Sequence, residues 1–243
     1  MELAKRLGAR VERYKLGEII VIDRTLEQID AKPLIDYVQK HIHELTAKRV
    51  HETFPELTQT PRDNLLFFDT ENCGLSNNDP VFLLAMAHMN KDLKFQSLLA
   101  RDYSEEKTLV EYFQRQLPVY RGFVTFNGQT FDIPRLNQRA IKNGLIELGS
   151  RSLSETMESR HLDLYSLVRT RLPVGRTKTL QTLEKVLFNF HRKHDIPGEK
   201  IPAEYRQWIY EGGNDEIMER IVNHNFIDTL SIVALFTYLC CHK

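Results

Sequence analysis

The residues best suited to chemistry lie where a short apolar segment ends. The apolar run 65–68 leads directly into Asp69-Thr70-Glu71, and Gly74 follows. An apolar run bounded by turn residues predicts a buried strand, on which successive side chains point to opposite faces. Asp69 and Glu71 then share one face, where their like charges repel. A hard divalent cation such as Mg²⁺ would relieve that repulsion, and the alternative is a strand that simply ends in polar residues.

A second carboxylate follows another apolar segment. The run 122–126 ends at Asn127-Gly128, and Asp132 comes shortly afterwards, just before Pro134. Because proline fits the first turn of a helix, Asp132 is expected at a helix start. The helix dipole alone favours an acidic residue there, so this position does not by itself require a ligand.

A third carboxylate, Asp228, stands in a strongly apolar segment that continues through residues 230–236. A charge on a buried helix is costly unless it is paired or bound to a metal. His224 is four residues earlier, so the two side chains share a helix face. They form either a structural hydrogen-bonded pair or part of a metal site.

The composition limits the class of protein to which the chain belongs. The chain has 243 residues, 42% of them hydrophobic and 27% charged, which is typical of a globular protein. The 33 Lys and Arg residues balance the 33 Asp and Glu residues. This balance argues against coating nucleic acid by net charge, but it allows a local basic groove.

Three features favour a cytoplasmic protein without a membrane partner. The chain has 3 cysteines, Cys73, Cys240 and Cys241, an odd number with no Cys-x-x-Cys spacing, so neither a disulfide framework nor a zinc site is predicted. The N-terminus has no apolar core of signal-peptide length. The apolar stretch 226–241 is short and contains Asp228, which argues against a membrane span.

Apolar periodicity predicts an α/β arrangement after residue 62. Strands are expected at 65–71, 81–88, 93–99, 122–126 and 161–168, with a hairpin turn at residues 90–92. Helices are expected at 105–117, with Ser104 as N-cap, and at 133–142, 180–190 and 221–241. The fold class is therefore α/β, with a mixed five-stranded central sheet flanked by helices. Residues 1–62, which include an apolar run at 17–23 suited to a strand, are expected to form an N-terminal arm that packs on the main domain, residues 63–243.

Taken together, the acidic motifs resemble the DEDD pattern of 3′-to-5′ exonucleases with the ribonuclease H-like fold. Phe68-Asp69-Thr70-Glu71 with Gly74-Leu75 resembles the first motif, residues 127–132 the second, and residues 224–228 the third. The stretch 180–205 is similar to the insert of bacterial YprB-type ribonuclease H-like domains. The resemblance covers about residues 64–238.

The resemblance implies a metal-dependent exonuclease that hydrolyses phosphodiester bonds at the 3′ end of DNA or RNA by a two-metal-ion mechanism. Two Mg²⁺ or Mn²⁺ ions would be held by four carboxylates, those of Asp69, Glu71, Asp132 and Asp228. The partner would be a single-stranded nucleic acid or a 3′ end. Its contacts would be made by Thr70, Leu75, Asn127 and Phe131, with Leu75 as a wedge against the terminal base.

The general base departs from the family pattern. The family carries a tyrosine four residues before the last aspartate or a histidine five residues before it. Here His224 takes the tyrosine position and Asn223 the histidine position. His224 is expected to act as the base, because position i−4 of a helix faces the same side as Asp228.

Two other functions remain open: a structure-specific endonuclease of the same fold, and a non-catalytic module that binds nucleic acid or protein. The presence of all four acids disfavours the module.

Three further groups of polar residues lie outside the acidic motifs. His41, His43 and His51 are expected to be solvated, and His161 with Asp163 to be structural. A basic cluster of Arg169, Arg171, Arg176 and Lys178 either holds phosphates or lines a solvated loop.

Overall fold

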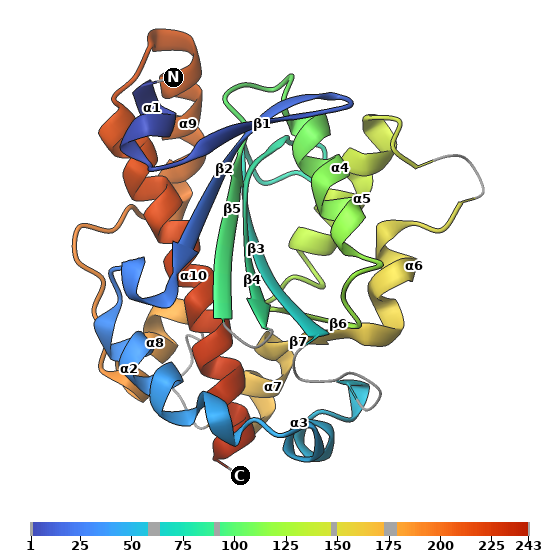
Figure 1. The fold of residues 1–243 in the computed structure, drawn as a ribbon, viewed down its shortest axis with the longest axis vertical. Helices are drawn as coiled ribbons and strands as arrows, with labels where there is room; N and C mark the ends of the chain where they lie inside the picture. Colours follow the sequence, from blue (N-terminus) through green and yellow to red (C-terminus); the bar gives the residue numbers. More distant parts are fainter. Residues whose placement is uncertain (1, 58–63, 90–92, 147–149, 173–178, 243) are drawn as a thin grey trace.

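A seven-stranded mixed sheet forms the centre of the molecule (Figure 1). Its strand order is β1-β2-β5-β4-β3-β6-β7. Neighbouring strands are antiparallel from β1 to β3, and the pairs β3/β6 and β6/β7 are parallel. The strands are β1 (Arg10–Tyr14), β2 (Gly17–Thr25), β3 (Leu65–Asn72), β4 (Val81–Met89), β5 (Leu93–Leu99), β6 (Gly122–Thr125) and β7 (His161–Asp163).

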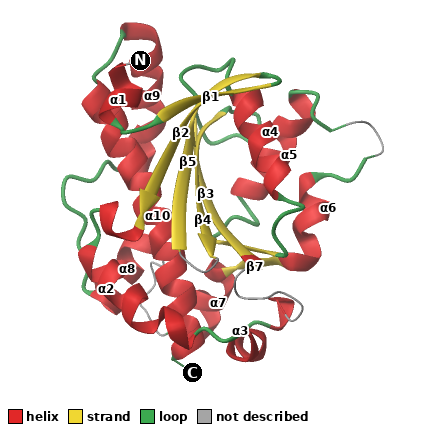
Figure 2. Ribbon diagram, in the orientation of Figure 1, coloured by secondary structure: helices red, strands yellow, loops and turns green. Residues whose placement is uncertain are grey.

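Helices cover both faces of this sheet (Figure 2). The structure is a computed structural model, and it describes residues 2–57, 64–89, 93–146, 150–172 and 179–242. The α-helices are α1 (Glu2–Arg6), α2 (Lys32–His41), α3 (Ala47–Thr53), α4 (Glu106–Gln116), α5 (Asp132–Lys142), α6 (Leu153–Met157), α7 (Leu164–Arg171), α8 (Leu180–Phe188), α9 (Ile201–Glu211) and α10 (Asp215–Cys241). Short 3-10 helices are η1 (Leu26–Gln28), η2 (Ile42–Glu44), η3 (Pro55–Leu57), η5 (Glu158–Arg160) and η6 (Gly198–Lys200). The predicted α/β class with a mixed, helix-flanked sheet is confirmed.

The predicted number of five strands is wrong, because residues 10–25 add β1 and β2 to the edge of the sheet. Strand β2 pairs with β5, with Ile20 opposite Leu99 and Ile22 opposite Ser97. The β2 residues 19–22 are buried. An apolar strand at this place was predicted, but its pairing partner lies more than 70 residues further along the chain. Residues 10–25 therefore share the sheet and core of the residues that follow.

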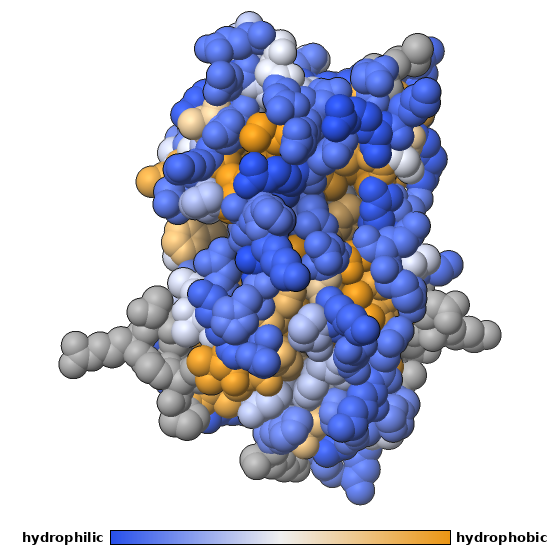
Figure 3. Space-filling view, turned by 90° about the vertical axis from the view of Figure 1, so that its left-hand side faces the viewer, coloured by the Kyte–Doolittle hydropathy of each residue, from blue (hydrophilic) through white to orange (hydrophobic). Residues whose placement is uncertain are grey.

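The long helix α10 packs along β3 and β4 on one face of the sheet, while α4 and α5 lie on the other face (Figure 1). Its 27 residues are long and apolar enough to cross a membrane by length and composition, but 83% of its apolar window is buried inside the protein. Most of the surface seen from the side of α1, α2, α8 and α9 belongs to hydrophilic residues (Figure 3). The hydropathy of α10 is thus explained by its place in the core.

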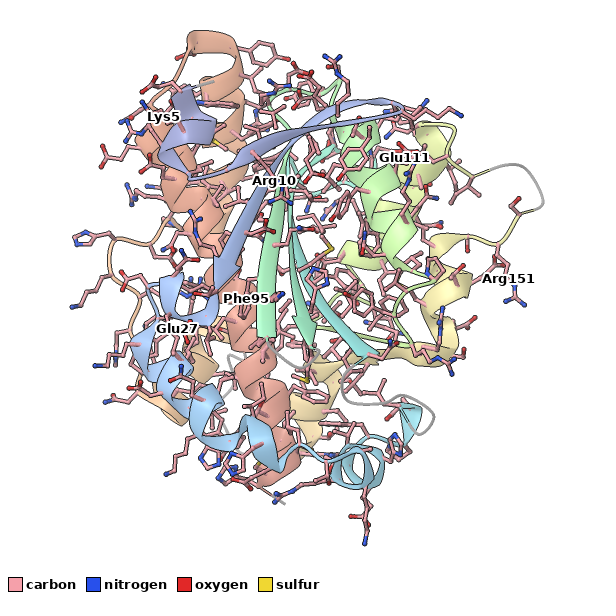
Figure 4. All side chains as sticks on the ribbon, viewed as in Figure 1. Lys5, Arg10, Glu27, Phe95, Glu111 and Arg151 are labelled. Atoms are coloured by element: carbon pink, nitrogen blue, oxygen red, sulfur yellow. The ribbon has the colours of Figure 1, made fainter. Side chains whose placement is uncertain are left out.

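Charged side chains such as Lys5, Glu27 and Arg151 lie on the outside of the molecule, whereas Phe95 is buried against the sheet (Figure 4). Helix α2 packs against α10, and its Leu34 and Val38 are buried. The segment between β2 and β3 is thereby attached to the core helix.

Two predicted boundaries differ from the structure. The strand expected at 161–168 ends at Asp163, because the Asp163 carboxylate accepts a hydrogen bond from the backbone N–H of Tyr165 and begins α7. The residue before α4 is Glu105 rather than Ser104, whose hydroxyl bonds to Asp102 instead. The predicted hairpin turn at residues 90–92 lies outside the described residues.

Candidate active site

Strand β3 delivers the first two acids to an open pocket of about 770 Å³. Its apolar residues 65–68 are buried between β4 and β6, which fixes the strand in the middle of the sheet. Asp69 and Glu71 emerge on the same face and both line the pocket. The Asp69 carboxylate accepts a hydrogen bond of 2.7 Å from the side-chain amide of Asn225 on α10. The core helix therefore sets the orientation of Asp69.

Thr70 joins the first acidic motif to the second. Its backbone N–H and its hydroxyl both donate to Oδ1 of Asp132, at 3.0 and 2.6 Å. Asp132 is the first residue of α5, as its position before Pro134 predicted. The hydroxyl of Thr70, which was expected to contact substrate, is thus committed to holding Asp132 in place.

The turn after β3 places Leu75 at the mouth of the pocket. A Cβ atom at Gly74 would collide with the side chain of Asp79, whose carboxylate accepts a hydrogen bond from the backbone N–H of Ser76 in the same turn. The buried guanidinium of Arg135 on α5 donates to the backbone carbonyls of Leu75 (3.1 Å) and Ser76 (3.3 Å). The side chain of Leu75 is consequently held outward, 95% exposed, and it lines the pocket rim.

The second motif is held by Asp163. Its carboxylate accepts hydrogen bonds from the backbone N–H groups of Asn127 (2.7 Å) and Gln129 (3.1 Å), and Asn127 has a positive φ of 64°. A Cβ at Gly128 would collide with the side chain of Thr125, which explains the Asn-Gly sequence. Asn127 and the half-exposed Phe131 line the pocket as a result. Asp163 has the structural role that was predicted for it.

Helix α10 supplies the remaining acid and the histidine. His224 Nε2 lies 3.2 Å from Oδ2 of Asp228 and 3.8 Å from Oε1 of Glu71. His224 Nδ1 lies 2.6 Å from Oδ1 of Asp195. The i,i+4 spacing correctly predicted that His224 and Asp228 meet. All five predicted catalytic side chains, those of Asp69, Glu71, Asp132, His224 and Asp228, line the one pocket.

Sequence reasoning missed the partners of Asp228. Arg192, in the segment between α8 and α9, forms an ion pair with Oδ1 of Asp228. It also binds Glu184 of α8, with Nε donating to Oε2 at 2.8 Å, and it lies 3.5 Å from Asp195. We call Glu184, Arg192, Asp195, His224 and Asp228 the Arg192 network. A buried acid on an apolar helix signals that some cation must pair with it, but no spacing rule indicates which one.

Burial and mutual repulsion raise the pKa values of the acids on β3 and α5. Burial, followed by the charges of Asp228, Asp132 and Glu71, holds the pKa of Asp69 well above its usual range. Burial raises the pKa of Glu71 to about 8, against the opposing effect of His224. Burial likewise raises the pKa of Asp132 to about 6, although its hydrogen bonds from Thr70 act the other way. These three groups are under electrostatic strain at neutral pH.

The pKa values on the α10 side move in the opposite direction. Burial alone would raise the pKa of Asp228, but Arg192 and His224 together hold it below its usual range. Burial alone would lower the pKa of His224, but Asp228, Asp195 and Glu71 raise it to about 11. His224 is therefore a protonated partner of these acids at neutral pH when they carry their full charge.

The donor set fits a hard divalent cation. Donor atoms of Glu71, His224 and Asp228 all lie within 4.8 Å of one another. Within the described ranges, no lysine or arginine forms an ion pair with Asp69, Glu71 or Asp132. Crowded carboxylates whose pKa values stay raised despite the nearby His224 and Arg135 are suited to Mg²⁺ or Mn²⁺, which prefer oxygen ligands.

The other predicted clusters have structural partners. Arg169 lies over the ring of Tyr165, and Arg171 donates to the backbone carbonyl of Thr53. Arg176 and Lys178, which complete the predicted basic cluster, lie outside the described residues. His41 is not simply solvated, because its Nδ1 lies 2.7 Å from Glu44, which also binds Arg49. Cys241 lies close to that pair, and the salt bridges account for the position of Glu44.

Comparison with known proteins now defines the class to which this fold and site belong. The family model of the RNase_H superfamily matches residues 66–240, so the chain belongs to this superfamily. In particular, the chain is 28% identical over 185 residues to "Uncharacterized protein YprB" of Bacillus subtilis (strain 168). The match covers 73% of this chain and 42% of that protein, so the chain spans less than half the length of this relative. The predicted resemblance to YprB-type ribonuclease H-like domains is confirmed.

A solved structure supports the same fold. The family B DNA polymerase from the hyperthermophilic archaeon Pyrobaculum calidifontis superposes with a TM-score of 0.55 at 20% sequence identity. The superposition covers 70% of this chain and 24% of the polymerase chain. At this level of identity the similarity defines the fold, and the chemistry must be argued from the site.

Proposed function

We propose that this protein is a metal-dependent nuclease that hydrolyses phosphodiester bonds at the 3′ end of DNA or RNA. The observation that carries the proposal is the meeting of four carboxylates, from β3, α5 and α10, in one open pocket. Membership in the RNase_H superfamily favours nuclease chemistry at such a cluster. The DEDD order of the four acids favours the exonuclease reaction within that class.

The site suits a phosphodiester because the substrate and the pocket are both anionic. Divalent cations held by Asp69, Glu71, Asp132 and Asp228 would supply the charge that stabilises the attacking and leaving oxygens of such a displacement. Asp69, which feels the charges of Asp228, Asp132 and Glu71, would be the ligand shared between the cations. Glu71 and Asp228 both lie beside His224, and Asp132 is held by Thr70.

His224 is placed to handle the proton of the attacking water. Asp195 accepts at Nδ1, which leaves Nε2 facing Asp228 and Glu71. The carboxylates that raise the pKa of His224 are the same groups that bind the cations. With these carboxylates neutralised by bound cations, the neutral imidazole that a base needs would be accessible closer to neutral pH.

The pocket rim suits a single strand better than a duplex. Leu75, Phe131, Phe126 and Tyr165 offer apolar and aromatic surface around the acids. Bases of an unpaired strand stack on aromatic side chains without regard to sequence. The neutral net charge of the chain agrees with binding through local contacts rather than through a broad basic surface.

A nuclease assay tests the proposal directly. Single-stranded DNA and RNA labelled at the 5′ end are incubated with Mg²⁺ or Mn²⁺, beside a circular single strand without ends. A ladder of shortened products and an intact circle are the expected result. A cut circle identifies an endonuclease of the same fold, and binding without any product identifies a binding module. Asp69→Asn should abolish the products, while Asp36→Asn, at an exposed acid on α2, should not.

A further inference from the structure

We propose that Arg192 is a positioning residue that fixes one carboxylate oxygen of Asp228 so that the other oxygen faces the cation site. This inference rests on the proposed function, because it concerns the same carboxylates. It assigns a role to the segment between α8 and α9, which contributes no acid of the DEDD pattern.

Arg192 is itself held rigidly. Its side chain is only 4% exposed, and that of Glu184 only 1%. Arg192 binds Glu184 with two nitrogens, Nε at 2.8 Å from Oε2 and Nη2 at 2.5 Å from Oε1. Glu184 also accepts a 2.7 Å hydrogen bond from the hydroxyl of Ser231 on α10. A planar guanidinium with a two-point partner has one orientation, which makes it a fixed reference point.

The rigidly held guanidinium of Arg192 binds one oxygen of Asp228. Arg192 Nη2 pairs with Oδ1 of Asp228, while Oδ2 of Asp228 faces Nε2 of His224 at 3.2 Å. The two oxygens are therefore not equivalent: Oδ1 is bound by the buried Arg192, and Oδ2 lies beside His224 Nε2, which is itself 3.8 Å from Glu71 in the pocket. A carboxylate without this anchor could rotate and offer either oxygen in several directions.

The same segment also fixes the histidine. Asp195 lies three residues after Arg192, at 3.5 Å from its guanidinium and 2.6 Å from Nδ1 of His224. Arg192 and Asp195 thus hold the two α10 side chains that face the pocket. Partners of this kind, which orient a metal ligand without touching the metal, typically contribute 10–100-fold in metal affinity or activity.

The direction in which cation affinity changes when Arg192 is replaced separates a positioning role from a purely electrostatic one. Removing a positive charge beside an anionic site strengthens cation binding if charge alone matters. Removing an anchor weakens cation binding, because Asp228 loses its orientation. The experiment measures the Mn²⁺ dissociation constant of the full chain by calorimetry at neutral pH, for the parent, Arg192→Lys and Arg192→Met. We expect Mn²⁺ binding to weaken about 10–100-fold in Arg192→Met and less in Arg192→Lys, which keeps the charge without the two-point contact.

Two controls make the result specific. Arg192→Lys is repeated in the Asp228→Asn background, where it should change the Mn²⁺ affinity by less than about 3-fold, because coupled residues are non-additive. Arg139→Met removes a second buried arginine, which pairs with Glu106 away from the acids, and should leave the Mn²⁺ affinity unchanged. If Arg192→Met does not fold, Arg192→Lys and its double variant carry the test.

Three outcomes would overturn the inference: equal or tighter Mn²⁺ binding in the Arg192 variants, the same loss in the Asp228→Asn background, or the same loss in Arg139→Met. The nuclease assay is independent of this measurement. A protein that binds Mn²⁺ as expected but cleaves nothing refutes the proposed function and leaves the role of Arg192 standing.

Discussion

On the β3 and α5 side of the pocket, the buried Asp132 and the partly buried Asp69 and Glu71 all have raised pKa values. On the α10 side, Asp228 is equally enclosed, yet Arg192 and His224 hold its pKa below the usual range. Both sides present carboxylates to the same pocket. They differ in whether the protein itself supplies the positive charge.

This difference indicates which part of the site depends on a bound cation. The acids on β3 and α5 can shed their mutual repulsion only by taking up protons or cations. Asp228 is already compensated and ordered by the Arg192 network. The network can therefore form before any cation arrives, and it offers a preformed ligand to a region that is otherwise under electrostatic strain.

The largest effect is expected at Asp69. Asp69→Asn should reduce hydrolysis by about 10³-fold or more, because a ligand shared by both cations contributes several kcal/mol to the transition state. The asparagine can still accept the hydrogen bond from Asn225, so the fold should be retained. Steady-state cleavage rates, with circular dichroism to verify folding, provide the measurement. Activity within a few-fold of the parent would remove Asp69 from the mechanism.

The next effect concerns His224, which belongs to both halves of the site. His224→Gln should lower the cleavage rate by about 10²-fold and flatten the ascending limb of the pH–rate profile, because a base must be neutral to act. The test compares profiles at saturating Mg²⁺, with Asn223→Ala as the neighbouring control. A profile whose shape is unchanged in His224→Gln would limit His224 to its ion pairs with Asp195 and Asp228.

Local patterns account for the parts of the site that the sequence predicted. Alternation along β3 places Asp69 and Glu71 together, and helical spacing brings His224 to Asp228, because both rules depend only on near neighbours in the chain. The same is true of Asp132, whose place at a helix start follows from Pro134. Each of these expectations agrees with the geometry.

Long-range contacts account for the parts that the sequence did not predict. Strand β2 was expected, but nothing local indicates that it pairs with β5. Arg192 and Asp195 lie in an irregular segment, and only tertiary folding brings them to α10. The family resemblance implied a substrate contact for Thr70, but it gave no sign that the Thr70 hydroxyl donates to Asp132 and so joins the two motifs.

Thermal stability without metal should separate the two halves by sign. In EDTA, Asp69→Asn should raise the free energy of unfolding by about 1 kcal/mol, because it removes a carboxyl group whose ionisation is opposed by the neighbouring acids in the folded state. Asp228→Asn should lower it by about 3–5 kcal/mol, because Arg192 then loses one of its buried partners. Urea unfolding of both variants gives the measurement. If both variants change the free energy of unfolding in the same direction, the two halves do not differ in how their carboxylates are compensated.

The pH dependence of that stability isolates Glu71. Its pKa is about 8 in the folded protein and near its ordinary value in the unfolded chain, so the folded state binds more protons between these two values. The contribution of Glu71 is therefore complete at pH below about 4 and is lost as the pH rises towards 8. Glu71→Gln removes this loss. In EDTA, its stability relative to the parent should increase by roughly 1–2 kcal/mol from pH 5 to 8, a shift of a few degrees in Tm.

The other titrating groups remain in both proteins, so the difference between the two curves reports Glu71. Saturating Mn²⁺ should remove that difference or reverse it, because a bound cation favours the charged carboxylate of the parent. Differential scanning fluorimetry across this pH range, with EDTA or Mn²⁺, makes the comparison. Parallel curves in EDTA would show that Glu71 ionises normally in the fold, and the strain assigned to the β3 side would then rest on Asp69 and Asp132 alone.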